Sequence, residues 1–227
     1  MAGFDYGDTW ASAERWLPEW AKPSHYELQS VYVPPNLESQ PCHYSILTSG
    51  DKLEKDNRWL RINRLGYAIR NSYCYFHLGC LEGHTDFCRY PYYWRYIGII
   101  KLFKEAQKNL SHLDRNSMVL YMDSDTMISN YTMRLESLSH LMTDHFLCVA
   151  LDDHCWYRHY IINVGSLLLS LDKMETYFFS LNVLILQKTQ ILLSYSSEWS
   201  RSGLNDQNIV ISLLNETKML NTDSPNT

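Results

Sequence analysis

Two carboxylates stand two residues apart at the end of an apolar run near the middle of the chain. The run Met118–Met122 (MVLYM) is followed by Asp123-Ser124-Asp125. Because the run is short and bounded by polar residues, it predicts a buried strand. Unpaired charge at the end of a buried strand is costly, and a divalent cation at the carboxyl edge of an α/β sheet would offset that cost. The pattern equally allows both aspartates to cap a turn or helix.

Two later segments carry polar groups that could face such a site. Residues 161–169 form an apolar run in which Gly165 stands close to Asn163. A glycine in that position predicts a bulge or a close approach of the backbone to another group. Asp206 and Gln207 lie just before a predicted helix, where the acid could equally serve as the helix N-cap.

The segments around these residues alternate between strand-like and helix-like patterns. Strands are predicted at 44–48, 72–78, 118–122, 146–151 and 161–169, and helices at 57–70, 92–109, 133–142, 171–200 and 208–214. This alternation indicates an α/β sheet flanked by helices. The first strand ends at Thr48, before a polar turn. Nucleotide-binding sheets usually begin in this way, although no glycine-rich phosphate loop is present.

The same patterns give a domain division. We expect a single α/β domain at 42–220, because the regular patterns begin only after residue 41. Residues 1–41 contain prolines and scattered aromatic side chains, and they predict an extended N-terminal arm. Residues 221–227 predict a disordered tail.

The predicted helix at 57–70 carries both apolar and basic positions. Leu60, Leu65 and Ala68/Ile69 are spaced to form one apolar face, and the other side carries four arginines: Arg58, Arg61, Arg64 and Arg70. The basic side is either a solvated face or the source of an arginine that reaches a diphosphate.

Composition limits the classes of function. The net charge of −5 argues against binding nucleic acid without sequence specificity. Six cysteines include no CxxC pair, so a structural zinc site is not expected, and the cysteine count alone assigns no disulfide. His84, Asp86 and Cys88 fall in one loop, but their spacing matches no standard metal motif.

Targeting signals are equally sparse. The N-terminus predicts neither a signal peptide nor an anchor, and no apolar run is long enough to span a bilayer. Glycosylation sequons begin at Asn109, Asn130 and Asn215, but three matches in a chain of this length only weakly support a secretory location.

Four segments, taken in order, resemble GT-A glycosyltransferases, in particular the superfamily of fungal α-galactosyl/mannosyltransferases and plant xyloglucan xylosyltransferases. They are the helix with Asn63, Arg64 and Tyr67-Ala68; the helix with Trp94-Arg95, where the family has Trp-x-Lys; the strand ending Met122-Asp123-Ser124-Asp125, as in the family's D-x-D motif; and Asn163-Val164-Gly165-Ser166 with the later Asn205-Asp206-Gln207. The resemblance implies a GT-A, Rossmann-like mixed sheet flanked by helices.

The resemblance also implies a reaction and a set of partners. The chain would move a sugar from a nucleoside-diphosphate sugar to a glycan or protein acceptor, with Mn²⁺ or Mg²⁺ neutralising the leaving diphosphate. Asp125 would be the direct metal ligand, and Asp123 would contact the ribose or the metal. A Golgi or other secretory lumen would be the usual location, and a soluble cytoplasmic location stays open.

The remaining site residues take their roles from the same resemblance. Thr48, Ser49, Arg64 and Tyr67 would contact the nucleotide. Asn163 and Gly165 would line the side of the sugar and acceptor. Asp206 would lie near the anomeric carbon or the acceptor hydroxyl, with Gln207 beside it.

The chain departs from this family in one respect that leaves alternatives open. The family has a histidine-containing strand after the position of Asp206, whereas the last histidine here is His159. We therefore expect a fold that lacks the C-terminal part. One alternative is a catalytically impaired, glycosyltransferase-like binding protein. Another is a phosphatase of the haloacid-dehalogenase type, although Met127 stands where that chemistry favours Thr or Val.

Overall fold

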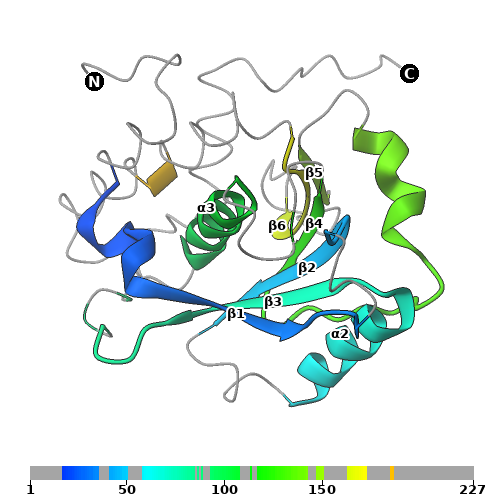
Figure 1. Cartoon of the computed structure of the whole chain (residues 1–227), viewed down its shortest axis with the longest axis horizontal. Helices are drawn as coiled ribbons and strands as arrows, with labels where there is room; N and C mark the ends of the chain where they lie inside the picture. The colour runs from blue at the N-terminus through cyan, green and yellow to red at the C-terminus, as the bar shows by residue number, and fades with distance from the viewer. Residues whose placement is uncertain are drawn as a thin grey trace, which may run out of the picture.

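A mixed six-stranded β-sheet forms the centre of the described part of the chain (Figure 1). Its strands are β1 (Tyr26–Tyr32), β2 (Tyr44–Ser49), β3 (Cys74–Cys80), β4 (Met118–Met122), β5 (Leu147–Ala150) and β6 (Asn163–Ser170). Their spatial order is β1-β3-β2-β4-β6-β5. The computed structural model describes residues 17–35, 41–50, 58–84, 86, 88, 93–107, 113, 117–142, 147–150, 163–172 and 185–186.

The three central strands run parallel and the outer ones antiparallel. β2 pairs in parallel with both β3 and β4, whereas β1 pairs antiparallel with β3. β6 pairs antiparallel with β4 on one side and β5 on the other. The carboxyl ends of β2, β3 and β4 therefore meet at one edge of the sheet, and β6 begins at that same edge.

Helices cover the two faces of the sheet (Figure 1). α3 (Trp94–Gln107) packs on one face, where its buried side chains meet Leu47, Val119 and Tyr121. α2 (Arg58–Asn71) and the 3₁₀ helix η7 (Leu135–Met142) cover the other face, against Ile46 and Met122. Because successive strand residues point to opposite faces, each central strand is buried on both sides. The predicted mixed α/β sheet with flanking helices is confirmed.

The segment before residue 41 contributes to this sheet. Two short 3₁₀ helices, η2 (Glu19–Ala21) and η3 (Pro23–His25), lead into β1, which forms the edge strand beside β3. Ala21 and Tyr26 are fully buried in the core. The boundary at residue 41 and the tail at 221–227 stay predictions, and the tail lies outside the described residues.

The structure corrects the predicted faces of α2. Ile69, assigned to the buried face, is 51% exposed, whereas Arg64, assigned to the solvated side, is 0% exposed. The side chains that pack on the sheet are Arg64, Tyr67 and Ala68. The prediction was right for Ala68, which is fully buried, and wrong for Ile69 and Arg64. The reason is a polar loop after β4 that lies against this helix, so its inner face includes a hydrogen-bond donor as well as apolar groups.

The three other predicted helices meet different outcomes. The helix predicted at 133–142 is a 3₁₀ helix over Leu135–Met142. Of residues 171–200 the structure describes Leu171 and Asp172, which are not helical, and the helical, buried pair Ile185 and Leu186. The helix predicted at 208–214 lies wholly outside the described residues.

Two disulfides connect cysteines that the sequence left unassigned. Cys42 pairs with Cys74 at the start of β3, and Cys80 at the end of β3 pairs with Cys88, with Cα atoms 6.1 Å apart in each pair. Cys88 is therefore not available as a thiolate ligand for a metal. No helix among the described residues is long and apolar enough to cross a bilayer.

Candidate functional site

The carboxyl edge of the central strands brings together three of the predicted site residues. Ser49 ends β2, Asp123 follows β4, and Gly165 lies near the start of β6. The backbone N–H of Asp123 donates to the carbonyl of Gly165 at 2.8 Å. The register between β5 and β6 shifts beside this point, between Val149 and Ala150. The irregularity predicted from the glycine is therefore confirmed, and it lies directly beside the D-x-D turn.

The carboxylate of Asp123 is held by two side chains on the α3 side of the sheet. The Tyr121 hydroxyl donates to Oδ1 at 2.9 Å, and Nη2 of Arg95 donates to Oδ2 at 3.1 Å. Ser49 Oγ lies 2.8 Å from the Tyr121 hydroxyl. Since the tyrosine proton is directed at Asp123, Ser49 supplies the proton of that contact. The four groups form a continuous network from β2 to α3.

The charge of this network is fixed by its surroundings. Burial raises the pKa of Tyr121 far above its ordinary value, so the phenol stays protonated and acts as a donor. The Arg95 side chain is only 7% exposed, and its guanidinium carbon lies 5.6 Å from the centre of the Tyr121 ring. Asp123 itself keeps 29% of its side chain exposed, so one side of the carboxylate remains accessible.

Asp125 lies at the tip of the turn and has a different environment. Thr126 closes the turn by donating its N–H to the carbonyl of Asp123 at 3.0 Å and its hydroxyl to the same oxygen at 2.8 Å. This turn places Asp125 at an exposed position. One aspartate of the motif is thus oriented by neighbouring side chains, and the other is presented to solvent.

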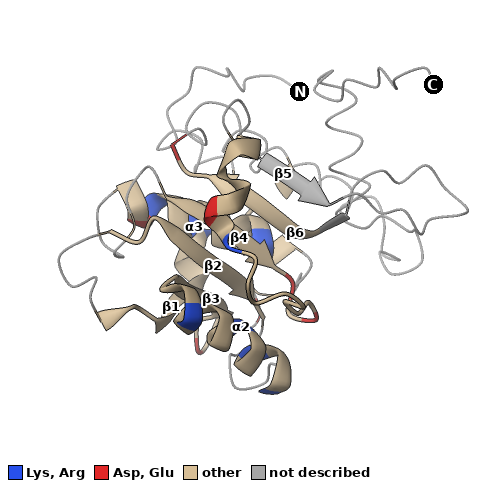
Figure 2. Cartoon of the chain, turned by 90° about the vertical axis from the view of Figure 1, so that its right-hand side faces the viewer, with Lys and Arg blue, Asp and Glu red and all other residues tan. Residues whose placement is uncertain are grey.

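The inner face of α2 holds the backbone of this turn (Figure 2). Arg64 donates to the carbonyl oxygens of Asp123 at 3.2 Å, of Thr126 at 3.1 and 3.2 Å, and of Ser124. A buried guanidinium has five N–H donors and no acceptor, which suits a cluster of backbone carbonyls. Arg64 therefore fixes the conformation of the turn that carries both aspartates.

Two further residues of α2 hold the following segment. The Asn63 amide donates to the carbonyl of Ile128 at 2.9 Å and accepts from its N–H at 2.8 Å. The Tyr67 hydroxyl donates to the carbonyl of Met133 at 2.5 Å. The predicted contacts of Arg64 and Tyr67 with a nucleotide stay predictions, while their contacts within the chain hold the segment after β4.

Thr48 and Ser49 point to opposite faces because side chains alternate along a strand. Ser49 joins the network around Asp123, whereas Thr48 lies on the α2 side. There its hydroxyl is 3.0 Å from Nδ1 of His77 and 3.3 Å from the hydroxyl of Tyr75. Burial, and then the charge of Arg64, lower the pKa of His77 to about 4. The imidazole is therefore neutral near pH 7. A nucleotide contact for either residue stays a prediction.

The remaining predicted residues are only partly described. The backbone of Asn163 pairs with Ala150, but its side chain is outside the described part, as are Asp206 and Gln207. Tyr121 was not predicted as a site residue. The alternation of the strand could have identified it, since it stands two residues before Asp123 and shares a strand face with that position.

The donor groups on this turn suit a hard divalent cation. Among the described residues, no group of three His, Cys, Asp or Glu side chains could hold a metal by itself. Mg²⁺ and similar ions, however, are commonly bound by one or two carboxylates together with substrate phosphates and water. The exposed Asp125 and the partly exposed Asp123 fit that kind of site.

Comparison with known proteins gives information about the fold. No protein-family profile and no curated protein sequence matches the chain. A solved structure described as a glycosyltransferase involved in the glycosylation of the major capsid of PBCV-1 is similar in fold, with a TM-score of 0.50. The similarity covers 77% of this chain and 77% of that one, at 16% sequence identity. At this level of identity the similarity concerns the fold.

Proposed function

We propose that the chain is a metal-dependent glycosyltransferase that moves a sugar from a nucleoside-diphosphate sugar to a glycan or protein acceptor. The observation that carries this proposal is the Asp123–Asp125 turn at the carboxyl edge of a central strand, the position at which open α/β sheets bind ligands. The similarity in fold to a glycosyltransferase supports the same reading.

The two aspartates have separate roles in this proposal. Asp125 would hold Mn²⁺ or Mg²⁺ together with the diphosphate oxygens of the donor, because it is exposed at the tip of the turn. Such a cation neutralises negative charge on a leaving diphosphate. Asp123, oriented by Tyr121 and Arg95, would accept a hydrogen bond from the ribose on its accessible side.

Arg95 contributes a fixed positive charge to this edge of the sheet. Its guanidinium is buried and already pairs with Asp123, so it holds this carboxylate in one orientation. Arg64 supports the same turn from the opposite face by binding its carbonyl oxygens. By the resemblance, Asn163, Asp206 and Gln207 would complete the sugar and acceptor side.

The first prediction tests the proposed metal ligand. Nucleoside diphosphate release would be measured over a panel of nucleotide sugars with Mn²⁺ and with Mg²⁺. We expect Asp125→Asn to lower kcat/KM at least 100-fold, because removing one electrostatic partner of the leaving group typically costs about that much. Asp172→Asn is the matched control. This exposed carboxylate follows β6 at the opposite edge of the sheet and should leave the rate unchanged.

Other outcomes would identify the alternatives. Binding of a nucleotide sugar without release of diphosphate, lost in Asp125→Asn, would contradict turnover and support a glycosyltransferase-like binding protein. Release of inorganic phosphate from a simple phosphomonoester would instead support a phosphatase.

A further inference from the structure

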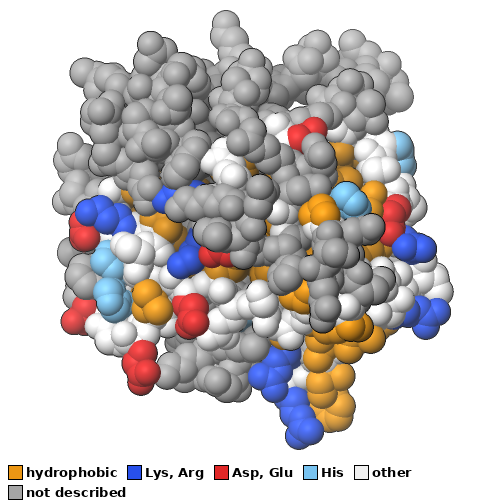
Figure 3. Space-filling model, viewed as in Figure 1, with side chains coloured by type: hydrophobic (Ala, Val, Ile, Leu, Met, Phe, Trp, Pro, Cys, Tyr) orange, Lys and Arg blue, Asp and Glu red, His pale blue; other side chains and the backbone are white. Residues whose placement is uncertain are grey.

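The outer face of α2 carries a stripe of exposed apolar side chains. Trp59, Ile62 and Ile69 are 76%, 46% and 51% exposed. Residues at positions i, i+3 and i+10 lie on the same side of an α-helix, so the three side chains form one stripe. Three of the six large hydrophobic side chains exposed in the described part of the chain lie on this single helix. In Figure 3 hydrophobic side chains gather over α2 with basic ones beside them.

Basic residues border this stripe on both sides. At 100° per residue, Arg58 and Arg70 fall within about 20° of its two edges, and both are exposed. The helix contains no Asp or Glu, although the whole chain has a net charge of −5. The outer face of α2 therefore combines an apolar centre with a positive border.

This combination favours a lipid surface over the other candidate partners. A second copy of the chain would have to place the same positive patch against itself across a two-fold axis, with no carboxylate on the helix to pair with it. A membrane with anionic lipids instead accepts tryptophan and isoleucine at the level of the headgroups, and arginine stems extend toward the phosphates. We propose that α2 docks on an anionic phospholipid surface through Trp59, Ile62 and Ile69, with Arg58 and Arg70 contacting headgroup phosphates.

The contacts of the same helix with the loop after β4 give this docking a consequence. Arg64 on the opposite face and Asn63 on the flank of the stripe hold the segment from Asp123 to Ile128. Docking would therefore place the D-x-D turn near the membrane surface. Docking itself does not depend on the proposed transfer reaction, so a test of binding can succeed or fail independently of an activity assay.

The test is sedimentation of the full chain with vesicles of phosphatidylglycerol and phosphatidylcholine, compared with pure phosphatidylcholine. We expect binding only to the anionic vesicles, weakening as salt is raised. Arg58→Gln with Arg70→Gln should weaken binding roughly 25-fold, since each arginine near an anionic surface contributes about fivefold. Trp59→Ser with Ile62→Ser should weaken it about tenfold or more.

Matched variants control for general effects. Leu141→Ser removes an apolar side chain that is 43% exposed on η7, and Lys22→Gln removes an exposed positive charge near β1. Neither should change vesicle binding. Circular dichroism would show that each variant keeps the fold.

Several results would overturn the proposal. They are the absence of binding to anionic vesicles, equal binding to neutral ones, or equal losses in the control variants. Binding of a single-stranded oligonucleotide at this face in place of vesicles would indicate nucleic acid. A dimer in solution that the α2 variants dissociate would indicate a second copy.

Discussion

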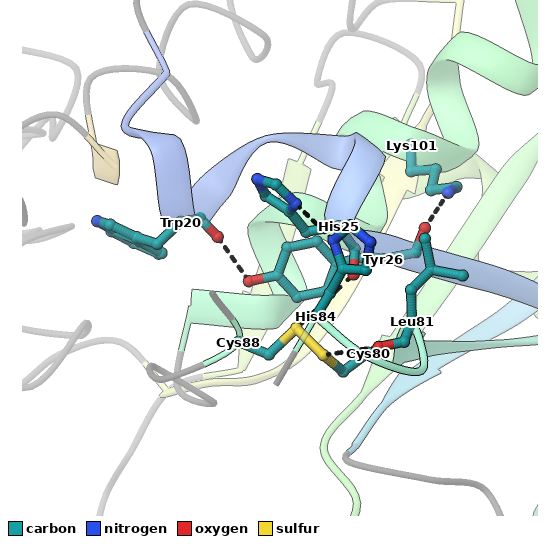
Figure 4. Close-up of a disulfide and its surroundings, with 8 residues drawn as sticks. All are labelled: Trp20, His25, Tyr26, Cys80, Leu81, His84, Cys88 and Lys101. Atoms are coloured by element: carbon teal, nitrogen blue, oxygen red, sulfur yellow. Dashed lines mark hydrogen bonds between the residues drawn. A yellow bond between two sulfur atoms is a disulfide. The ribbon is translucent and has the colours of Figure 1, made fainter. Parts of the chain in front are cut away.

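The loops that follow β3 and β4 start at the same edge of the sheet but are held by different chemistry. The loop after β4 is held by hydrogen bonds from Asn63 and Arg64 on α2. The loop after β3 is closed by the disulfide between Cys80 and Cys88, and His84 on that loop lies against His25 (Figure 4).

The histidine contact adds a second element to the loop after β3. Nδ1 of His25 and Nδ1 of His84 are 3.0 Å apart, so one nitrogen donates and the other must be unprotonated. The N–H of Leu81 donates to the carbonyl of His25 at 3.0 Å. This loop is thus fastened to the segment before β1, whereas the loop after β4 is fastened to a helix.

The difference matches what each loop carries. The loop after β4 presents Asp123 and Asp125, and the hydrogen bonds from α2 hold the backbone of this turn without engaging either carboxylate. A covalent closure can restrict a loop, but it does not orient carbonyl groups one by one. The two loops can therefore be weakened separately, and the predictions below do so in order of decreasing effect.

The largest expected effect is the loss of Arg64. Arg64→Met removes the buried guanidinium that donates to the carbonyls of Asp123, Ser124 and Thr126, and we expect the free energy of unfolding to fall by about 4 kcal/mol. Urea unfolding followed by circular dichroism would measure the change. Arg70→Met is the control on the same helix. Its side chain is exposed, and it should cost less than about 0.5 kcal/mol. Equal losses in both variants would contradict the role of Arg64.

Arg64 also shows where sequence patterns reach their limit. Short apolar runs correctly predicted the central strands and helical spacing correctly predicted α3, because both patterns reflect apolar burial. The same rule failed for Arg64 on α2, a buried guanidinium that binds backbone carbonyls from a loop about sixty residues away in the sequence. No local pattern encodes such a partner.

The candidate site also has parts that could be predicted from the sequence and parts that could not. The D-x-D turn was predicted from the residues themselves, since two carboxylates after a buried strand need a compensating partner. The Arg95 contact was not predictable, because it joins α3 to β4 only through the tertiary arrangement. The pairing of the cysteines could not be predicted for the same reason, since a cysteine count does not determine which cysteines form disulfides.

A smaller effect follows from His77, which lies buried beside Thr48 on the α2 side of the sheet. Its pKa is lowered from 6.5 to about 4, so the unfolded chain binds a proton at a higher pH than the folded one. This contribution to stability is complete above pH 6.5 and is lost as pH falls from 6.5 to 4, by up to roughly 3 kcal/mol. Unfolding measured across this range should show a shallower pH dependence for His77→Gln.

The charge of Arg64 connects this effect to the loop after β4. Arg64 is the second cause of the low pKa of His77, after burial. Arg64→Met should therefore raise the pKa of His77. It should also narrow the pH range over which the contribution of His77 to stability is lost, in addition to lowering the free energy of unfolding. Arg70→Met, which removes an exposed positive charge of the same helix, serves as the control and should leave the pKa of His77 unchanged. An unchanged profile for His77→Gln would contradict this assignment.

The smallest of these effects concerns the loop after β3. Removing the Cys80–Cys88 bond by serine substitution at both positions should lower the free energy of unfolding by about 2.5 kcal/mol, given a sequence separation of 8 residues.

Hydrogen exchange distinguishes the two loops in this variant. The amides of Leu81 and His84 should exchange faster, because their acceptors belong to this region. The amides of Thr126 and Ile128 should keep their protection, because their acceptors lie in the turn after β4 and on α2. In Arg64→Met we expect the opposite result: faster exchange at the amides of Thr126 and Ile128, and unchanged protection at those of Leu81 and His84. Loss of protection in both loops of the serine variant would mean that the loops open together. That result would contradict the claim that they are held independently.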